Sequence, residues 1–379
     1  MRSPDSDRPV HRMRALREAV SDADSHSRRG GRMIAREWQF ALPEKKHKKK
    51  YFGNLKAEVI DAGLCCHCAA CASICPVNGI TAGDAPIDFP NWVKECVDCG
   101  ACIKVCPRWE YTPKNGLGEY IEVVAARSKR FVGQDGAMVT EFTASALEMG
   151  IIERAIFVAR DSNWRTRVVT IKTPEQLYDR KITGTKYSYA DVLPALKEAV
   201  LKSEAVGFVG TPCMVSAVRK MQQAFKKFER VKLAIGLFCT ENFYHHDLYK
   251  FLLEKANADL RNAVKTDIKK GKFIVEMKDG SKVRIPVKDF EEIIPSGCKV
   301  CQDFAAVESD VSVGSVGSPN RFSTVMVRTE VAKQILDYIR EKDYAEFGEA
   351  KLDIVQKLCD HKMKIHPWPP KKKEEKSEE

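Results

Sequence analysis

The sequence lacks any long apolar run. None approaches the roughly 18 residues that a membrane-spanning helix needs, so we expect no direct insertion into a membrane. The N-terminus also lacks the short apolar core of a secretory signal peptide, which predicts a cytoplasmic protein. Internal repeats are absent apart from one doubled cysteine motif. The composition, with 44% hydrophobic and 30% charged residues, is that of an ordinary globular protein.

Most of the chain also lacks a strong excess of either charge, although the formal net charge is +11. Residues 1–50 hold 14 Lys and Arg against 7 Asp and Glu, whereas the rest holds 49 against 45. We therefore expect residues 1–54 to form a basic, disordered extension, with a nucleic-acid-binding arm as the alternative. The charged end, residues 361–379, is expected to be a disordered tail.

Residues 121–360 alternate short β-branched runs with helical stretches. The runs at 121–127, 205–210 and 232–238 each precede a stretch with helical periodicity. This alternation is typical of an α/β domain with a parallel sheet. Asp279 and Gly280 supply the turn of a further hairpin.

Eight of the 14 cysteines stand in two copies of one motif. The pattern C-x2-C-x2-C-x3-C-P occurs at 65–76 and again at 96–107. Disulfides are rare in cytosolic proteins, and zinc sites need only CxxC pairs. The spacing is that of bacterial-type two-cluster ferredoxins, so it predicts a module over residues 55–108 that holds two 4Fe–4S clusters.

In this motif the fourth cysteine of each run ligates the other cluster. The expected ligands of one cluster are Cys65, Cys68, Cys71 and Cys106, and those of the other are Cys75, Cys96, Cys99 and Cys102. We expect Cys66 and Cys359 to be packed or idle thiols. His67 is expected to support the ligands or to lie at the surface.

Four further cysteines lie far apart in the α/β region. Cys213 and Cys239 each end a predicted strand just before a helix, and in a parallel sheet such strand ends share the edge where ligands bind. Cys298 and Cys301 form a separate CxxC pair. This arrangement predicts a third 4Fe–4S site, with two buried core thiols and an unrelated CxxC as the alternative.

These motifs together carry a resemblance to a known family. The ferredoxin motifs are followed in order by GQDGAMVTEF, TGTKYS, GFVGTPCMVSAVRK, IGLFCTENFYHHD, CKVCQDF and SVGSVGSP. Over residues 58–340 the chain resembles the beta subunit of coenzyme F-420-reducing hydrogenase. Among relatives it is most similar to the stand-alone electron-input subunit of reduced-F-420:quinone or methanophenazine dehydrogenases.

The resemblance implies an α/β flavoprotein domain with an N-terminal two-cluster ferredoxin-like module. It implies that FAD in the α/β domain accepts hydride from reduced F-420 and passes single electrons to 4Fe–4S clusters. It also places the ligands of a third cluster on Cys213, Cys239, Cys298 and Cys301. F-420 carries hydride whereas clusters carry single electrons, so a flavin is the converter that the chemistry requires.

Gly-bearing loops ahead of helices can offer backbone N–H groups to the FAD diphosphate, although each such loop alone is more often a turn. The candidate cofactor contacts are Gly133, Gln134, Asp135, Gly136, Thr140, Lys186, Thr211, Pro212, Asn242, Gly314, Ser315, Gly317, Ser318 and Arg328. The family usually has a second glycine where Ala137 stands, so we expect the backbone there to avoid a conformation restricted to glycine.

The phosphate and glutamate tail of F-420 predicts a basic groove. The candidates are Lys186, Lys299, Arg321 and Arg328, with surface solvation as the alternative for each. We expect His245 and His246 to begin a helix and not to act as acid or base.

The favoured interpretation is an oxidoreductase that oxidises reduced F-420 at FAD and passes electrons to a larger redox complex. That complex would be a membrane-associated quinone or methanophenazine dehydrogenase, with this chain on the cytoplasmic side; run in reverse, reduced ferredoxin would drive F-420 reduction. Nucleic acid is not an expected partner, and a nucleic-acid-binding iron–sulfur protein would rest on the basic extension alone. Two further hypotheses are a chlorophyll-ring reductase of the same architecture and a non-catalytic iron–sulfur bridging subunit.

Overall fold

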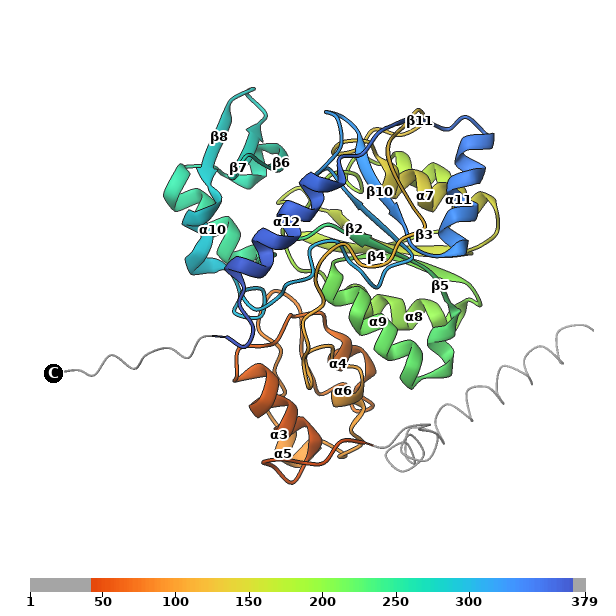
Figure 1. The fold of residues 1–379 in the computed structure, drawn as a ribbon. Helices are drawn as coiled ribbons and strands as arrows, with labels where there is room; N and C mark the ends of the chain where they lie inside the picture. Colours follow the sequence, from red (N-terminus) through yellow and green to blue (C-terminus); the bar gives the residue numbers. More distant parts are fainter. Residues whose placement is uncertain (1–41, 371–379) are drawn as a thin grey trace, which may run out of the picture.

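A computed structural model describes residues 42–370 (Figure 1). The disorder expected at the two ends concerns mainly residues 1–41 and 371–379, which lie outside the described part. Within it, an α/β domain lies above a small helical module, and a three-stranded sheet lies to one side. No helix of residues 42–370 is both long and apolar enough to cross a membrane.

The α/β domain is built on an eight-stranded mixed sheet with the order β11-β1-β10-β9-β5-β4-β2-β3. The strands are β1 (Glu122–Ser128), β2 (Arg154–Arg160), β3 (Thr166–Ile171), β4 (Val206–Gly210), β5 (Val231–Leu237), β9 (Val311–Gly314), β10 (Ser323–Val327) and β11 (Ala345–Gly348). The central strands β2, β4, β5 and β9 run parallel, and the remaining pairs are antiparallel. The predicted α/β class is therefore confirmed, with antiparallel flanks that the alternation of runs did not indicate.

Helices cover both faces of this sheet. α7 (Met138–Glu148) and α11 (Glu330–Glu341) pack on one face, and α8 (Val192–Lys202) and α9 (Pro212–Ala224) pack on the other. The buried residues of α8 recur at helical spacing, which directs one apolar face toward the sheet. Pro212 suits the first position of α9 because its fixed φ matches a helix and its missing N–H is not needed there.

The module comprises α3 (Tyr51–Leu55), a π-helical turn (Lys56–Ile60), α4 (Ala70–Ile74), α5 (Trp92–Glu95) and α6 (Ala101–Lys104). The boundary predicted between residues 54 and 55 is wrong, because the module already includes α3. Phe52 is buried there with its ring centroid 5.2 Å from that of Phe89. Burial of this aromatic pair ties the start of α3 to the rest of the module.

The module shares a core with the α/β domain. Cys68, Ala70 and Val105 of the module lie in one buried cluster with Leu196 of α8 and Val215 of α9. Burial of this apolar surface makes the module an integral part of the molecule, not a tethered appendage.

A second, antiparallel sheet contains β6 (Ala263–Lys269), β7 (Lys272–Met277) and β8 (Lys282–Pro286). The predicted hairpin is confirmed as β7–β8, with Gly280 at φ 85° in its turn. α10 (His245–Ala256) packs against this sheet. Short 3-10 helices lie at Pro174–Tyr178, Lys226–Arg230, Leu260–Asn262 and Val287–Ile293.

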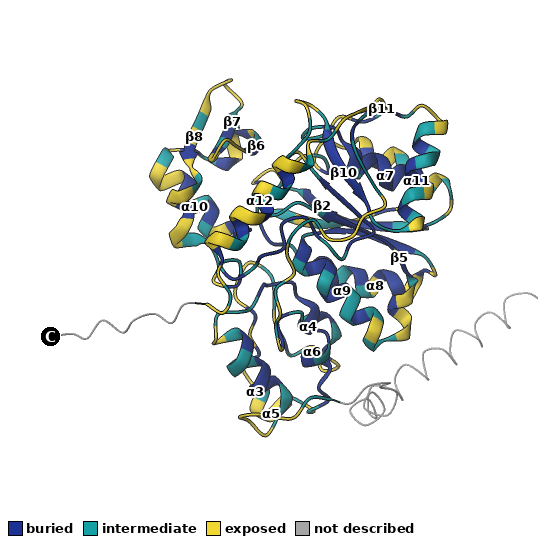
Figure 2. Ribbon diagram, in the orientation of Figure 1, coloured by how far each residue is buried: buried dark blue, intermediate teal, exposed yellow. Residues whose placement is uncertain are grey.

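The chain passes through a last helix, α12 (Leu352–Ile365), which runs beside the main sheet (Figure 1). The tail predicted from residue 361 therefore begins too early: Lys362 is 1% exposed and His366 is 6% exposed. Figure 2 shows α12 exposing one side to solvent and burying the other. The buried side carries Val355 and Cys359, and this apolar face holds the helix in place.

Candidate iron–sulfur and cofactor site

The predicted site residues of the α/β domain follow strands that end at one edge of the sheet. Gly210 at the end of β4 pairs with Gly236 of β5, and Leu237 at the end of β5 pairs with Val313 of β9. The residues after these parallel strands therefore gather at the same edge, which we call the carboxyl edge. Open α/β sheets bind ligands at this edge.

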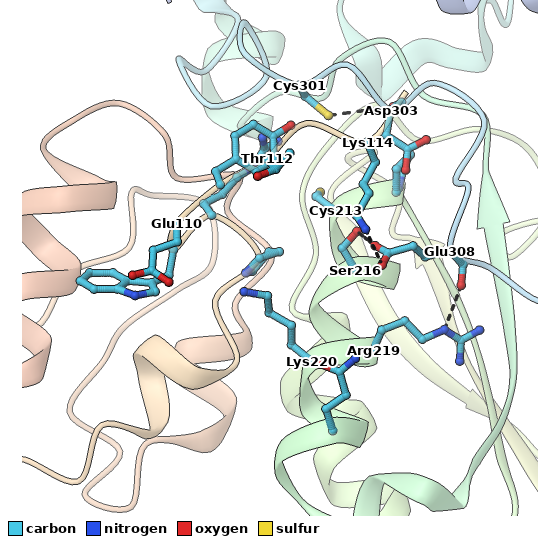
Figure 3. Close-up of a pocket in the computed structure, with 16 residues that line it drawn as sticks. Glu110, Thr112, Lys114, Cys213, Ser216, Arg219, Lys220, Cys301, Asp303 and Glu308 are labelled. Atoms are coloured by element: carbon cyan, nitrogen blue, oxygen red, sulfur yellow. Dashed lines mark hydrogen bonds and ion pairs between the residues drawn. The ribbon is translucent and has the colours of Figure 1, made fainter. Parts of the chain in front are cut away.

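The structure brings Cys213, Cys239, Cys298 and Cys301 together at the carboxyl edge. Cys213 lies in the first turn of α9 and Cys301 on a facing loop, and both line one cavity of about 260 Å³ (Figure 3). The Nζ atom of Lys362 lies 2.6 Å from the carbonyl oxygen of Cys239 and 3.7 Å from Sγ of Cys301. Sγ of Cys298 lies 3.4 Å from the hydroxyl of Tyr189.

These cysteines are half-buried, and the burial of their thiols disfavours ionisation without a compensating cation. Burial raises the pKa of Cys239, and the neighbouring Cys298 and Cys301 raise it further. Burial is also the main cause that raises the pKa of Cys298. Metal ligation requires thiolates, so an iron–sulfur cluster would supply the positive charge that lets this group of cysteines deprotonate together.

The eight cysteines of the module fall into two groups. The charges of Cys65 and Cys106 both raise the pKa of Cys71, after burial as the main cause. In the same way, after burial as the main cause, the charges of Cys75 and Cys96 raise the pKa of Cys99. These neighbours belong to different runs, and Cys102 of the second run also raises the pKa of Cys71, so the cysteines of the two runs lie close together and the crossed ligand pattern stays a prediction.

The two cysteine runs also share an unusual backbone. The residues on either side of the second cysteine have positive φ in both runs: His67 at 55° and Ala69 at 62°, and Asp98 at 58° and Gly100 at 75°. Left-handed residues are rare outside glycine, so the same pair in both loops indicates a shared requirement. Successive N–H groups in such turns can point at an anion, as around a cluster.

Single-ion sites are not found in the part of the chain that the structure describes. In residues 42–370 no three His, Cys, Asp or Glu side chains are grouped closely enough to hold one metal ion. A cubane of iron and sulfide is larger than one ion, so its thiolates stand farther apart.

Arg108 lies between the module and the carboxyl edge. Arg108 is only 3% exposed, and its Nη2 atom lies 3.3 Å from the carbonyl oxygen of Gly297. Its Nε and Nη1 atoms have no hydrogen-bond partner, although Cys66, Cys213 and Cys301 are all close enough to raise its pKa. A buried cation with free donors beside thiols fits an anionic iron–sulfur cluster.

Cys66 is packed, but it is not remote from the predicted ligands. Sγ of Cys213 lies 3.9 Å from the carbonyl oxygen of Cys66, and the side chains of Cys213 and Cys68 lower the pKa of the Cys66 thiol. Cys359 packs in α12 with Sγ 3.3 Å from the carbonyl oxygen of Gly116. His67 is buried, with its ring centroid 4.5 Å from that of Tyr189.

The loop 133–136 lies between β1 and α7, at the carboxyl edge. A Cβ on Gly136 would lie 2.2 Å from the carbonyl oxygen of Ala126, so only glycine permits this backbone approach. Ala137 has a φ of 56°, in the left-handed region that favours glycine but is not restricted to it. This conformation costs roughly 1–2 kcal/mol for an L-residue.

The first turn of α7 has no side-chain cap. Its leading N–H groups are therefore available to a ligand at the end of a helix of 11 residues. A diphosphate would fit this chemistry, and Thr140 lies buried in the same turn region.

Two of the predicted contacts join the loop 133–136 to neighbouring segments. Nε2 of Gln134 donates to the carbonyl of Thr266 at 2.9 Å, and Asp135 pairs with Lys269 at 3.6 Å. Nζ of Lys186 donates to the carbonyl of Gly184 at 2.9 Å, and burial lowers the pKa of Lys186 to about 7. Thr185, next to Lys186, donates its N–H to Oε1 of Gln134 at 3.5 Å and accepts from the hydroxyl of Thr266 at 3.2 Å, so Lys186 lies near the loop 133–136 and β6.

The glycines of the GSVGS loop have a packing role. A Cβ on Gly314 would lie 2.2 Å from the ring of Phe238, and one on Gly317 would lie 2.9 Å from the carbonyl oxygen of Lys351. Ser318 hydrogen-bonds Thr324. For Ser315 no side-chain contact stands out among the described residues.

Arg328 has its donors occupied within the fold. Nε lies 2.8 Å from Oγ of Ser312 and Nη2 lies 3.1 Å from the carbonyl of Ala305, and burial lowers the pKa of Arg328 to about 10. Lys299 pairs with Glu291 at 2.7 Å, and Arg321 is exposed. Within residues 42–370 no hydrogen bond or ion pair brings these three residues together with Lys186.

The remaining candidates lie at strand ends. Thr211 is the N-cap of α9, with Oγ1 3.2 Å from Sγ of Cys213, and Pro212 follows it. Asn242 accepts a hydrogen bond from the N–H of Phe243 at 3.0 Å. His245 is the first residue of α10, as expected.

Sequence reasoning missed Arg108 and Lys362. Arg108 follows the second Cys-Pro closely, so its position was a usable signal. Lys362 lies about sixty residues beyond Cys301, and nothing in the spacing connects the two.

The family profiles cover most of the described chain. The profiles of the coenzyme F-420 hydrogenase/dehydrogenase beta subunit match residues 123–197 with their N-terminal part and 203–352 with their C-terminal part. A 4Fe-4S dicluster domain matches residues 57–107.

Individual relatives agree with the profiles. One subunit of the F(420)H(2) dehydrogenase of Methanosarcina mazei is 34% identical over 81% of this chain and 92% of its own length. The coenzyme F-420-dependent sulfite reductase of Methanocaldococcus jannaschii is also 34% identical, and the chain spans 50% of that relative. A solved chain of the F-420-reducing [NiFe] hydrogenase complex from Methanosarcina barkeri matches with a TM-score of 0.63 and 32% identity, over 67% of this chain and 92% of its own. With an iron–sulfur module ahead of its sheet, this chain belongs to the family of coenzyme F-420 hydrogenase/dehydrogenase beta subunits.

Proposed function

We propose that this chain oxidises reduced F-420 at a bound FAD and passes single electrons through three 4Fe–4S clusters to a partner redox complex. The observation that carries the proposal is the order of the cysteine groups. The group at the carboxyl edge lies next to the module, and the two module groups follow in sequence toward the surface.

Contacts between the groups support this order. Sγ of Cys213 at the carboxyl edge lies 3.9 Å from the carbonyl oxygen of Cys66, and the side chains of Cys213 and of Cys68 in the first module group both lower the pKa of Cys66. The second module group lies near the first, because the charge of Cys106 in the first group raises the pKa of Cys102 in the second. Electrons would therefore move from the carboxyl edge through the first module group to the second.

The outermost group is the proposed exit. Cys96 is only half-buried, and its neighbour Val97 is 44% exposed. An electron-transfer partner could therefore approach the second module group from this side.

FAD, when bound, would accept a hydride and release electrons one at a time. The chain's own contribution is to bind and orient it. The uncapped first turn of α7 and the close backbone approach at Gly136 support a diphosphate there. Gln134 and Lys186 would border the same space.

The partner is proposed from the relatives. The name of the Methanosarcina mazei relative supports a dehydrogenase complex, which we take to be a quinone or methanophenazine dehydrogenase. Reversal, with reduced ferredoxin as donor for F-420, uses the same residues, because potentials and not contacts set the direction.

Anaerobic reconstitution tests the proposal. The protein with iron, sulfide and FAD should take up flavin, and its visible spectrum should bleach when reduced F-420 is added. Iron without flavin uptake would contradict the proposal and support a bridging subunit, and activity on a chlorophyllide would support the ring reductase.

A pair of cysteine variants tests the third site. Cys213→Ser should lose about one third of the iron and slow F-420-linked dye reduction at least tenfold, while the module clusters stay in place. Cys359→Ser, a packed thiol outside the predicted ligands, is the matched control. Unchanged iron and unchanged rate in Cys213→Ser would remove the third cluster from the proposal.

A further inference from the structure

Lys362 is a buried ammonium group directed at the third cysteine site. Its Nζ atom lies 2.6 Å from the carbonyl oxygen of Cys239, 2.7 Å from that of Asp303 and 3.7 Å from Sγ of Cys301. The residue is 1% exposed, so water does not solvate the charge. Two neutral carbonyls hold the ammonium group in place but do not balance it.

Burial of an ammonium group without a counter-charge is strongly unfavourable. The nearest carboxylate, that of Asp303, is directed at the backbone N–H of Val307 at 3.3 Å, and no ion pair within 4 Å joins it to Lys362 in the described chain. Negative charge near Lys362 can come first from the sulfurs of Cys301 and Cys239, and to a lesser extent from the carboxylates of Asp303 and Glu241. The ammonium group is therefore stable here chiefly when those sulfurs carry charge.

Arg108 provides a second buried cation on the module side of the same site. Its guanidinium lies 4.0 Å from the ring centroid of Tyr111, and Nε and Nη1 have no partner. It lines the cavity that Cys213 and Cys301 also line. Arg108 and Lys362 thus come from segments far apart in the chain, and the charge of Cys301 acts on both.

We infer that Lys362 and Arg108 are positioning residues of the third cluster, which hold its cysteine ligands between two buried cations and raise its reduction potential. This inference rests on the proposed function, because it requires the third cluster. A nearby positive charge and hydrogen bonds to ligand sulfur both favour the reduced, more negative form of a cluster. The third cluster would then accept electrons readily beside the flavin.

α12 is the helix that carries Lys362 to the third cysteine site. It ends at Ile365, beyond the residues 203–352 that the family profile matches. His366, just after the helix, hydrogen-bonds the carbonyl oxygen of Cys301 through Nδ1 at 2.8 Å. The end of α12 therefore contacts the site through two residues.

The test is a redox titration of the reconstituted full chain, followed by electron paramagnetic resonance, with iron counted in each sample. Lys362→Met should lower the reduction equilibrium constant of the third cluster at least tenfold, which is 59 mV for one electron. The midpoints of the two module clusters should not change. Arg108→Gln should act in the same direction, and Arg108→Lys should recover part of the shift.

Lys357→Met is the matched control, because Lys357 lies on the exposed side of α12 and pairs with Asp353 at 3.1 Å. Lys362→Arg keeps the charge and should stay close to the wild type. A full iron content with an unchanged third midpoint in Lys362→Met would overturn the inference.

If Lys362→Met and Lys362→Gln both lose the third cluster while Lys362→Arg keeps it, the result supports the inference. Loss in all three variants overturns it, because charge would then not matter. A wild-type protein that binds only about eight irons would instead contradict the third cluster of the proposed function.

Discussion

Individual glycines differ in how much space the fold leaves for a side chain. At Gly136 the backbone of Ala126 and Ser323 fills the space where a side chain would be, whereas Gly150 has nothing within 4 Å of its Cβ position. The first position therefore depends on the absence of a side chain, and the second only on its φ of 69°.

Gly136→Ala should destabilise the protein by about 3 kcal/mol or more, because its Cβ would lie 2.2 Å and 2.5 Å from backbone atoms that cannot move independently. Gly150→Ala should cost only about 1 kcal/mol, the strain of a left-handed alanine. Urea unfolding of both variants measures the difference. Equal losses would show that the contact at Gly136 relaxes.

Lys186 should make stability depend on pH. Burial lowers its pKa to about 7, below that of the unfolded chain, so between about pH 7 and 10 the unfolded state binds more protons. The free energy of unfolding should therefore rise with pH in this window through Lys186. Relative to the wild type, Lys186→Met should be more stable at pH 6 and lose this advantage as pH approaches 10.

Unfolding curves at several pH values, with Lys181→Met as an exposed control from the same segment, check this dependence. A wild type and a Lys186→Met variant with parallel pH profiles would show that Lys186 stays solvated.

At the scale of single elements, the start of α10 is linked to the iron–sulfur module. α10 begins at His245, and its first two N–H groups, those of His245 and His246, both donate to the carboxylate of Asp84 in the module. The module thus caps a helix of the α/β domain that is 161 residues away in sequence.

Asp84→Ala should destabilise the protein by about 1 kcal/mol, because two N–H groups at the start of α10 lose their acceptor. Asp88→Ala, an exposed carboxylate of the same loop region, should change stability by less than about 0.5 kcal/mol. Thermal unfolding compares the two. A loss confined to Asp88→Ala would contradict the capping role.

Across the whole molecule, the module and the α/β domain share one core. Cys66 and Cys68 lie in the same buried cluster as Leu193, Leu196 and Met214. Because metal binding stabilises the folded state over the unfolded one, loss of the clusters should affect the α/β domain as well.

Anaerobic removal of iron should therefore lower the Tm of the entire chain in scanning calorimetry. The holo protein should show one main transition, and the apo protein should begin to unfold several degrees lower, since about 1 kcal/mol shifts the Tm of a domain by a few degrees. An α/β transition at the same temperature with and without iron would mean that the two parts fold independently.

The local patterns predicted much of this molecule. β1, α7, β4, α9, β5, α10 and the β7–β8 hairpin lie where apolar periodicity and turn residues placed them. The cysteine spacing predicted the iron–sulfur module, because a short loop that must surround a cluster leaves few alternative spacings. These elements and the cysteine motif depend on interactions between residues a few positions apart, and such interactions can be inferred directly from the sequence.

Only the tertiary structure could decide what comes together from distant segments. The antiparallel flanks of the sheet, the left-handed Ala137, the shared core of module and domain, and the action of the Cys301 charge on both Arg108 and Lys362 all depend on contacts between residues far apart in the chain. Charge, burial and hydrogen-bond partners at such contacts are properties of the packed molecule. For that reason candidate ligands could be proposed from the cysteine spacing alone, whereas the buried cations beside them required the fold.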